Sequence, residues 1–363
     1  MNLSVCNADF VTVVVKVVDY CNFECDFCRY YQTQKEGRCG KTLQMDTFKK
    51  IIKKACEYNY KKGLKHLTVI FHGGEPLLWG LNNFTEAIQY ENIIKETYSG
   101  FYFVNDIQTN GSLINDEWAD FFYNNNFSIG ISIDGPEDIN FHKGKEISNN
   151  EVIENLRILD NHRCKYGILS VITEKHYGKA REYYDFLVKN EIHSVGLCYC
   201  FSTNKVNLVS NKTLIDFLTE LFNLYFNGNF KLHIREFEFV MKLSLGVKVE
   251  GCTFDYRRSC GNYFSIDSEG NIYFCDSYDL NEISIGNIDV LDFFEIKENP
   301  LFNSIVLKAR KSALSECSKC SIQGICGGGC YRHVLPNGKH AFCETFRELY
   351  PYIEDTVKKE VAK

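Results

Sequence analysis

The stretch Cys21-Asn22-Phe23-Glu24-Cys25-Asp26-Phe27-Cys28 holds three cysteines in a C-x3-C-x2-C pattern. Iron–sulfur clusters are held by cysteine thiolates, normally four of them for a [4Fe–4S] cubane. Three closely spaced thiolates hold three irons and leave the fourth iron open for a ligand that is not protein. Zinc sites more often pair cysteines as C-x2-C with a second pair, or with histidines, later in the chain. The pattern therefore favours an iron–sulfur cluster with an open iron over a zinc knuckle or a set of buried thiols.

The motif follows residues 12–18, a nearly continuous β-branched run typical of a strand buried on both faces of a parallel sheet. Further strands and helices alternate along the chain, which predicts right-handed crossovers and a parallel sheet. Polar motifs follow the ends of successive strands, and barrel sites are built from such loops, so a barrel or partial barrel is favoured. The predicted strands are 12–18, 67–71, 102–108, 128–133, 167–171 and 194–200, and the predicted helices are 45–58, 116–124, 149–162 and 178–190.

Length and composition restrict the class of protein. The 363 residues, of which 45% are hydrophobic, suggest one large α/β domain and a smaller one with well-buried cores. The formal net charge of −6 and the lack of a basic tract argue against binding to nucleic acid. We find no apolar run of about 18 residues, which predicts no membrane span. No signal peptide is evident at the start, so a cytoplasmic protein is expected.

Seventeen cysteines are unusual for a cytoplasmic chain, where disulfides are rare, and they point to metal or redox centres. Three lie in the opening motif and eight lie between Cys252 and Cys343. The others are predicted to be small buried hydrophobes, because most free cysteines are. These six are Cys6, Cys39, Cys56, Cys164, Cys198 and Cys200.

A second motif, Gly73-Gly74-Glu75-Pro76, follows the second predicted strand. With the three-cysteine loop it resembles the radical S-adenosylmethionine (SAM) enzymes, which have a six-stranded (β/α)6 partial TIM barrel. The resemblance implies that Gly73, Gly74 and Glu75 hold the amino end of SAM and that Phe27 lies against the adenine. It also implies contacts to ribose and carboxylate from segments whose Asn-Gly and Asp-Gly pairs are also ordinary turn formers. The residues expected there are Asn110, Ser132 and Asp134.

The eight later cysteines resemble the SPASM extension of radical SAM enzymes, which carries auxiliary [4Fe–4S] clusters. A predicted hairpin of strands 263–266 and 272–274 lies among them. The resemblance implies one auxiliary cluster on Cys252, Cys260, Cys275 and Cys330 and another on Cys317, Cys320, Cys326 and Cys343. The expected domains are a barrel at 1–205, a helical bridge at 206–250 with a helix near 213–226, the SPASM domain at 251–345 and a C-terminal helix at 346–363.

The resemblance implies an enzyme with three [4Fe–4S] clusters that cleaves SAM reductively to a 5′-deoxyadenosyl radical. That radical abstracts hydrogen from a peptide or protein side chain, and a flavodoxin or ferredoxin supplies electrons. His72 before the glycines, and Arg29-Tyr30-Tyr31-Gln32 after the cluster motif, depart from the anaerobic sulfatase maturases and favour a maturase of ribosomally made precursor peptides. The alternative is a sulfatase maturase that converts Cys or Ser to formylglycine, in which Asp276 corresponds to the proposed base.

Two alternatives belong to other classes of protein. A non-catalytic electron-transfer protein would use the iron–sulfur clusters but would need no SAM pocket, and residues 73–76 argue against it. A zinc-stabilised interaction protein would use the C-x2-C pair at Cys317 and Cys320. At Asp276 itself, an aspartate that caps a turn beside a cluster would give the same sequence pattern.

Overall fold

The computed structural model describes residues 9–25, 27–28, 40–139, 149–201, 209–249, 252, 260–276, 284–315 and 317–363. The chain divides into two compact units. The first comprises residues 1–131, 142–166 and 258–307, and the second comprises residues 132–141, 167–257 and 308–363. The chain therefore passes between the units more than once, and each is described in turn.

The sheet of the first unit is mainly parallel. Strands β1 (Thr12–Val18), β2 (His66–Gly73), β3 (Tyr102–Thr109) and β4 (Ser128–Ser132) pair in sequence order. On its other edge, β1 pairs in parallel with β8 (Tyr263–Ile266). Strand β8 forms the predicted hairpin with β9 (Asn271–Tyr273), and β10 (Gly286–Asn287) completes the edge. The hairpin of the cysteine-rich region is thus continuous with the strand that leads into the three-cysteine motif.

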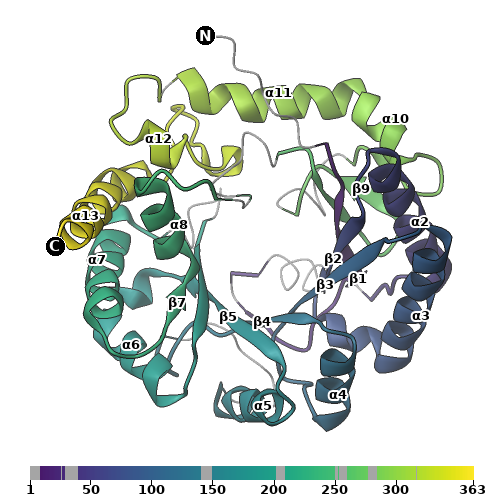
Figure 1. Ribbon diagram of the computed structural model, residues 1–363, viewed down its shortest axis with the longest axis horizontal. Helices are drawn as coiled ribbons and strands as arrows, with labels where there is room; N and C mark the ends of the chain where they lie inside the picture. Colours follow the sequence, from purple (N-terminus) through teal and green to yellow (C-terminus); the bar gives the residue numbers. More distant parts are fainter. Residues whose placement is uncertain are drawn as a thin grey trace. The chain divides into compact units, whose positions relative to one another are not determined.

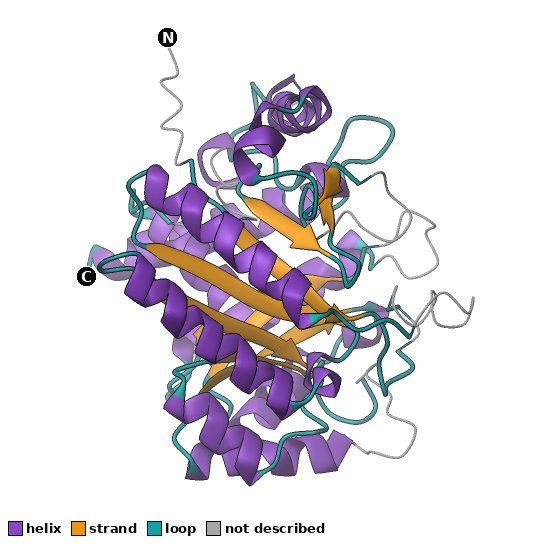
Figure 2. Cartoon of the chain, turned by 90° about the vertical axis from the view of Figure 1, so that its right-hand side faces the viewer, coloured by secondary structure: helices purple, strands orange, loops and turns teal. Residues whose placement is uncertain are grey.

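Helices α2 (Met45–Lys61) and α3 (Leu81–Thr97) lie together over one face of this sheet (Figure 1; Figure 2). The interface is aromatic: Phe71 of β2 stacks on Phe48 of α2 at 5.9 Å between ring centroids and contacts Phe84 of α3 at 4.9 Å. All three side chains are fully buried. Helix α3 was not predicted from the sequence, although its Phe84, Ala87, Glu91 and Ile94 recur at helical spacing on its buried side.

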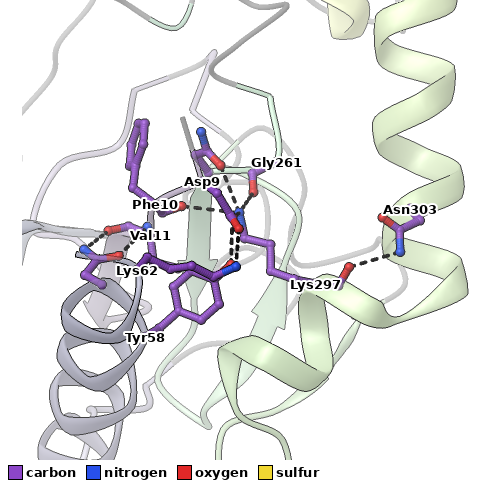
Figure 3. Close-up of polar contacts among 10 residues, drawn as sticks. Asp9, Phe10, Val11, Tyr58, Lys62, Gly261, Lys297 and Asn303 are labelled. Carbon is purple, nitrogen blue, oxygen red and sulfur yellow. Dashed lines mark hydrogen bonds and ion pairs between the residues drawn. The ribbon is translucent and has the colours of Figure 1, made fainter. Parts of the chain in front are cut away.

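The ammonium group of Lys297 fixes the cysteine-rich segment beside the start of β1 (Figure 3). Lys297, in helix α10 (Phe293–Glu298), donates hydrogen bonds to the carbonyl oxygens of Gly261, at 2.7 Å, and Phe10, at 3.3 Å. Its ammonium also forms an ion pair with Asp9 at 3.3 Å. Because these partners are far apart in the sequence, Lys297 holds β8 in register with β1.

The second unit continues the βα pattern. Strands β5 (Lys165–Ile172), β6 (Ser194–Tyr199) and β7 (His233–Ile234) pair in parallel. Helix α7 (Asn211–Asn227) is the predicted bridge helix, and α13 (Cys343–Val361) is the predicted C-terminal helix. The first six strands are thus confirmed, with ends that differ from the prediction by two residues at most. The remaining elements are α4 (Asp116–Asn124), α5 (Asn149–Asn161), α6 (Ala180–Lys189), α8 (Arg235–Ser244), α11 (Pro300–Ser315), α12 (Gln323–Cys326) and the 3-10 turns η1 (Pro76–Trp79), η2 (Glu174–His176) and η3 (Tyr331–His333).

Replacing Glu91 with glutamine is expected to flatten the pH dependence of stability. Burial raises the pKa of the Glu91 carboxyl to about 7, although Asn105 donates a hydrogen bond to it at 2.8 Å. A folded pKa above the unfolded value means that stability is full below the unfolded pKa, about 4.3, and is lost as pH rises through about 7. At pH 8, E91Q should therefore unfold with a free energy up to about 3 kcal/mol higher than the parent.

The measurement is thermal unfolding of the anaerobic holoenzyme at pH 5 and pH 8. Glu96→Gln, at an exposed position of the same helix, is the matched control. Parallel pH profiles for E91Q and the parent protein would show that Glu91 is not protonated in the folded state.

Within the described ranges, every helix is too short or too polar to cross a bilayer.

Candidate active site

The three-cysteine loop leaves the C-terminal end of β1. Cys25 is buried, and Cys21 and Cys28 are half-buried. The loop turns on a hydrogen bond from the Cys28 amide to the Cys25 carbonyl, at 3.0 Å, and the Phe23 amide donates to the Cys21 sulfur at 3.3 Å. Burial, together with the charges of Glu75, Cys28 and Cys25, raises the pKa of Cys21 to about 12. A thiol held where its free thiolate is unfavourable, in a loop with two further cysteines, fits a metal cluster, which stabilises thiolates.

The two glycines after β2 lie against the backbone of that loop. The Gly74 amide donates to the Val18 carbonyl and the Glu75 amide donates to the Tyr20 carbonyl, both at 2.9 Å. A Cβ atom on Gly74 would lie 1.8 Å from the Tyr20 oxygen, and one on Gly73 would lie 2.2 Å from the Val18 oxygen. The glycines are therefore required by contact between two protein segments, in addition to any contact with a ligand.

Replacing Gly74 with alanine is expected to destabilise the protein by about 3 kcal/mol or more, because the backbone of Tyr20 has no room to accept a methyl group. Thermal unfolding of the anaerobic holoenzyme measures the effect. Gly324→Ala is the control, since a Cβ there meets nothing within 4 Å. Equal unfolding temperatures for the two variants would contradict the close approach.

Glu75 is buried, and its carboxylate is held by three protein donors. Oε1 accepts from the Leu77 amide at 3.0 Å and the Thr109 hydroxyl at 2.7 Å, and Oε2 accepts from the Asn110 amide at 2.8 Å. Burial raises the pKa of Glu75 to about 7 despite these bonds. A carboxylate has about four lone-pair sites. Glu75 thus joins the ends of β2 and β3 and keeps acceptor capacity for one further donor.

Asn110 connects this carboxylate to the cysteine loop. Its Nδ2 donates to Asn22 Oδ1 at 2.9 Å and lies 3.6 Å from the sulfur of Cys21. Its Oδ1 accepts from the hydroxyl of Ser112 at 2.6 Å, and Asn22 donates to the same hydroxyl at 2.8 Å. The structure therefore brings Asn110, Glu75 and Cys21 together, as the sequence suggested, and adds Asn22 and Ser112. Asn22 lies within the three-cysteine motif, but no role was predicted for it or for Ser112, because their contacts depend on the tertiary structure.

The other residues expected at a SAM pocket divide between the two units. Phe27 is half-buried in the cysteine loop of the first unit. Ser132, at the end of β4, and Asp134 belong to the second unit. Asp134 is fully buried, and its Oδ1 accepts from the Val171 amide at 2.8 Å while its carbonyl contacts His176 Nε2 at 3.1 Å. Asp134 therefore ties the chain after β4 to the end of β5.

An ion pair in the first unit was missed by sequence analysis. Lys16 lies in the middle of β1 with its side chain only 2% exposed, and its ammonium is 3.4 Å from Oδ1 of Asp276, which is 41% exposed. In the parallel ladder Lys16 is the register partner of His72, so both side chains lie on the sheet face opposite Phe71. The sequence did contain a signal for this ion pair: a lysine within a β-branched strand is expected to be buried, and a buried charge needs a partner of opposite charge. The ammonium fixes the Asp276 carboxylate at the end of the SPASM hairpin.

Four of the later cysteines line one cavity of about 510 Å³ in the second unit. Burial, with the charges of the other three thiols, raises the pKa of Cys326 to about 12. This set fits the second auxiliary cluster predicted from the sequence. Its members are Cys317, Cys320, Cys326 and Cys343.

The ligands expected for the other auxiliary cluster divide between the units, with Cys260 and Cys275 in the first and Cys252 and Cys330 in the second. Their common ligation stays a prediction, as do the domain boundaries. All fifteen cysteines among the described residues carry free thiols. Of the scattered ones, Cys56 and Cys200 are buried and Cys164 and Cys198 are half-buried. Cys6 and Cys39, and the segment Arg29-Tyr30-Tyr31-Gln32, lie outside the described residues.

Comparison with known families and proteins identifies the chain's family. Residues 15–187 match the model of the radical SAM superfamily, and residues 258–321 match the model of the SPASM iron–sulfur cluster-binding domain. The chain is 30% identical over 356 residues to a cysteine-type anaerobic sulfatase-maturating enzyme of Clostridium novyi, covering 91% of each chain. The chain belongs to the anaerobic sulfatase-maturating family of radical SAM enzymes. A serine-type member from Bacteroides thetaiotaomicron is 24% identical over 387 residues, which covers 96% of this chain and 91% of that one.

Solved structures agree on the fold of this radical SAM enzyme. The structure of anSMEcpe with bound AdoMet superposes with a TM-score of 0.84 over 96% of each chain, at 23% identity. Streptococcus suis SuiB bound to its precursor peptide SuiA gives a TM-score of 0.63 at 18% identity, over 94% of this chain and 75% of SuiB. The predicted partial barrel with a SPASM domain is confirmed.

Family membership also settles the chemistry at a coarse level. The protein is a radical SAM oxidoreductase that acts on a peptide or protein side chain, as predicted. Its cofactors are SAM and three [4Fe–4S] clusters, one that binds SAM and two auxiliary clusters. The zinc protein and the non-catalytic electron carrier are not supported.

Proposed function

We propose that this radical SAM enzyme converts a cysteine of a sulfatase to formylglycine. The observation that carries the proposal is the 30% identity, over 91% of both chains, to the cysteine-type enzyme of Clostridium novyi. The fold likeness to anSMEcpe with its Cp18Cys peptide, with a TM-score of 0.80, exceeds that to SuiB with its precursor peptide. For the finer choice of substrate, the relatives thus favour the alternative that sequence analysis placed second to a ribosomal precursor peptide.

In this proposal the cluster that splits SAM is held by Cys21, Cys25 and Cys28, and when bound it supplies the electron that generates the 5′-deoxyadenosyl radical. Glu75, with its remaining acceptor capacity, and the backbone around it receive the ammonium group of SAM. The bonds from Thr109 and Asn110 orient that carboxylate. The remaining SAM contacts are assigned to Phe27, Gly73, Gly74, Asn110, Ser132 and Asp134.

Asp276 is proposed as the base that takes the proton of the substrate thiol. Its side chain is 41% exposed, so a bound peptide can reach it. The buried ammonium of Lys16, which forms an ion pair with it, orients the carboxylate. With SAM and the clusters bound, the conversion would remove one hydrogen atom, one proton and one electron from the cysteine; Asp276 would take the proton, and the auxiliary clusters would accept the electron. Water then replaces the sulfur, which leaves as sulfide, and the product is an aldehyde.

The auxiliary clusters are assigned to Cys252, Cys260, Cys275 and Cys330, and to Cys317, Cys320, Cys326 and Cys343. As fully ligated clusters they serve as electron acceptors rather than substrate sites. A flavodoxin or ferredoxin is the proposed donor for SAM cleavage. We propose the reducing cytoplasm as the place of action, since oxidation of so many thiols would prevent cluster assembly.

The test uses holoenzyme reconstituted anaerobically, with SAM, dithionite and matched peptides that differ only in a cysteine, serine or alanine at the maturation site of a sulfatase. Trapping with a hydrazine and mass spectrometry detect the aldehyde. The proposal expects aldehyde from the cysteine peptide at a rate at least about tenfold above that from serine, and none from alanine. If neither the cysteine nor the serine peptide gave aldehyde while SAM was still cleaved, the sulfatase assignment would be contradicted. The precursor-peptide alternative would then be favoured.

A further inference from the structure

His340 lies in the wall of the cavity formed by Cys317, Cys320, Cys326 and Cys343. Its backbone carbonyl accepts a hydrogen bond from the amide of Cys343 at 3.0 Å, so the histidine is tied to one of the four thiol-bearing residues. Neither the family resemblance nor the cysteine spacing assigned it a role. A polar ring at this wall is therefore a feature of this chain that needs its own explanation.

The hydrogen-bonding pattern defines which nitrogen of the ring carries the proton. The amide of Phe342 donates to Nδ1 of His340 at 3.2 Å, so Nδ1 is an acceptor. A neutral imidazole with an acceptor at Nδ1 carries its hydrogen on Nε2. That Nε2–H group has no acceptor among the residues that the structure describes. His340 is therefore a cavity-lining residue with an unused donor.

The Nε2 edge of the ring is directed at the glycine-rich loop between two cysteines. A Cβ atom on Gly329 would lie 2.7 Å from both Nε2 and Cδ2 of His340. Gly329 has a φ of +70° and directly precedes Cys330, three residues after Cys326. The glycine thus leaves room for the donor edge of the ring beside the thiol-bearing loop.

Aromatic neighbours hold the ring in this orientation. His340 packs against Phe346 at 5.2 Å and Phe342 at 5.8 Å between centroids, and edge-on against His333 at 5.6 Å. Because three rings and one backbone amide fix it, the imidazole loses little entropy when it donates a hydrogen bond. His333 belongs to the same aromatic group but does not line the cavity.

We propose that His340 donates a hydrogen bond from Nε2 to the auxiliary [4Fe–4S] cluster held by the four cysteines and raises its reduction potential. Reduction adds one electron, and hence one negative charge, to the cluster and its thiolates. A fixed N–H donor stabilises the more negative state more strongly, and hydrogen bonds to sulfur are a known determinant of cluster potentials. The cluster then accepts the substrate electron more readily. This inference rests on the cluster and not on which side chain the enzyme oxidises.

The test compares His340→Gln with His340→Met in the anaerobic holoenzyme. The two side chains have nearly the same shape, but only glutamine retains an N–H donor at the reach of Nε2. Redox titration followed by EPR should show that H340M lowers the equilibrium constant for reduction of one cluster about tenfold, equivalent to about 59 mV for one electron. H340Q should remain within about threefold of the parent protein. A Cys320→Ala variant identifies which wave belongs to this cluster.

A second readout does not depend on the potential. Proton ENDOR of the reduced cluster, recorded in H2O and D2O, should show an exchangeable coupling in the parent and H340Q that is missing in H340M. The same Gln and Met pair at His333 is the control and should change neither quantity. Equal potentials and unchanged couplings for H340M and H340Q would overturn the proposal, as would an equal shift for the His333 pair. If H340M fails to incorporate iron, H340F, which fills the ring's space without a donor, takes its place.

Discussion

Cys21→Ala will abolish the formation of 5′-deoxyadenosine from SAM. In the proposed site, the SAM-binding cluster then loses one of its three protein ligands. The side chains of Asn22 and Asn110 lie beside the Cys21 sulfur, and neither supplies a thiolate. Iron content should fall from about 12 per chain toward about 8, since each [4Fe–4S] cluster holds four irons and the two auxiliary clusters keep their own cysteines.

The measurement pairs iron analysis with chromatography of the reaction mixture under dithionite. Cys164→Ser is the matched control, because Cys164 is a half-buried thiol of the same unit that lies outside the cluster motif. It should retain the iron content and the SAM cleavage of the parent. Continued SAM cleavage by C21A would refute the assignment of the cluster loop.

Asp276→Asn is expected to reduce formation of the aldehyde product by roughly 10²- to 10⁴-fold, the usual range for loss of a positioned base. Asparagine preserves the size of the side chain and removes its basicity. Cleavage of SAM should persist, because Cys21, Glu75 and Asn110 form a hydrogen-bonded group that does not include Asp276. The variant should therefore accumulate 5′-deoxyadenosine without an equivalent amount of aldehyde.

The readout is the ratio of aldehyde to 5′-deoxyadenosine, which a simple loss of folding would leave unchanged. Asp289→Asn, at an exposed position of the same unit that pairs with Lys50, is the control. Lys16→Met should shift the ratio in the same direction as D276N, because it removes the cation 3.4 Å from the Asp276 carboxylate. If D276N keeps the parent's ratio, the aspartate only caps the turn beside Cys275.

The sequence was sufficient for those parts of the molecule that local patterns encode. The β-branched run of β1 and the turn residues between β8 and β9 each specify a local structure within a few residues. Helix α3 was missed because its apolar stripe is weak, with Glu91 among the four residues of its buried side. Interactions that depend on tertiary contacts were also missed, as the ion pair of Lys16 with Asp276 and the ring of His340 show.

The role of the glycines shows a second limit of sequence reasoning. Gly73 and Gly74 were expected to make room for a ligand, and the structure adds that they make room for Val18 and Tyr20. A glycine motif shows that some group must come close to the backbone, but it does not show whether that group belongs to a ligand or to another segment of the protein. The same holds for Glu75, whose carboxylate binds three donors of the protein itself. Motif residues can thus serve the fold and a cofactor at once.

The most direct test of the proposed function follows one hydrogen atom. A substrate peptide carrying deuterium at Cβ of its maturation cysteine is incubated with the holoenzyme, SAM and dithionite, and the 5′-deoxyadenosine is analysed by mass spectrometry. The proposal predicts one deuterium in each 5′-deoxyadenosine formed by the parent enzyme, in step with the aldehyde. In Asp276→Asn the yield of aldehyde should fall markedly, whereas labelled 5′-deoxyadenosine should still form. Unlabelled 5′-deoxyadenosine alongside aldehyde, or label appearing only when another residue is deuterated, would contradict it.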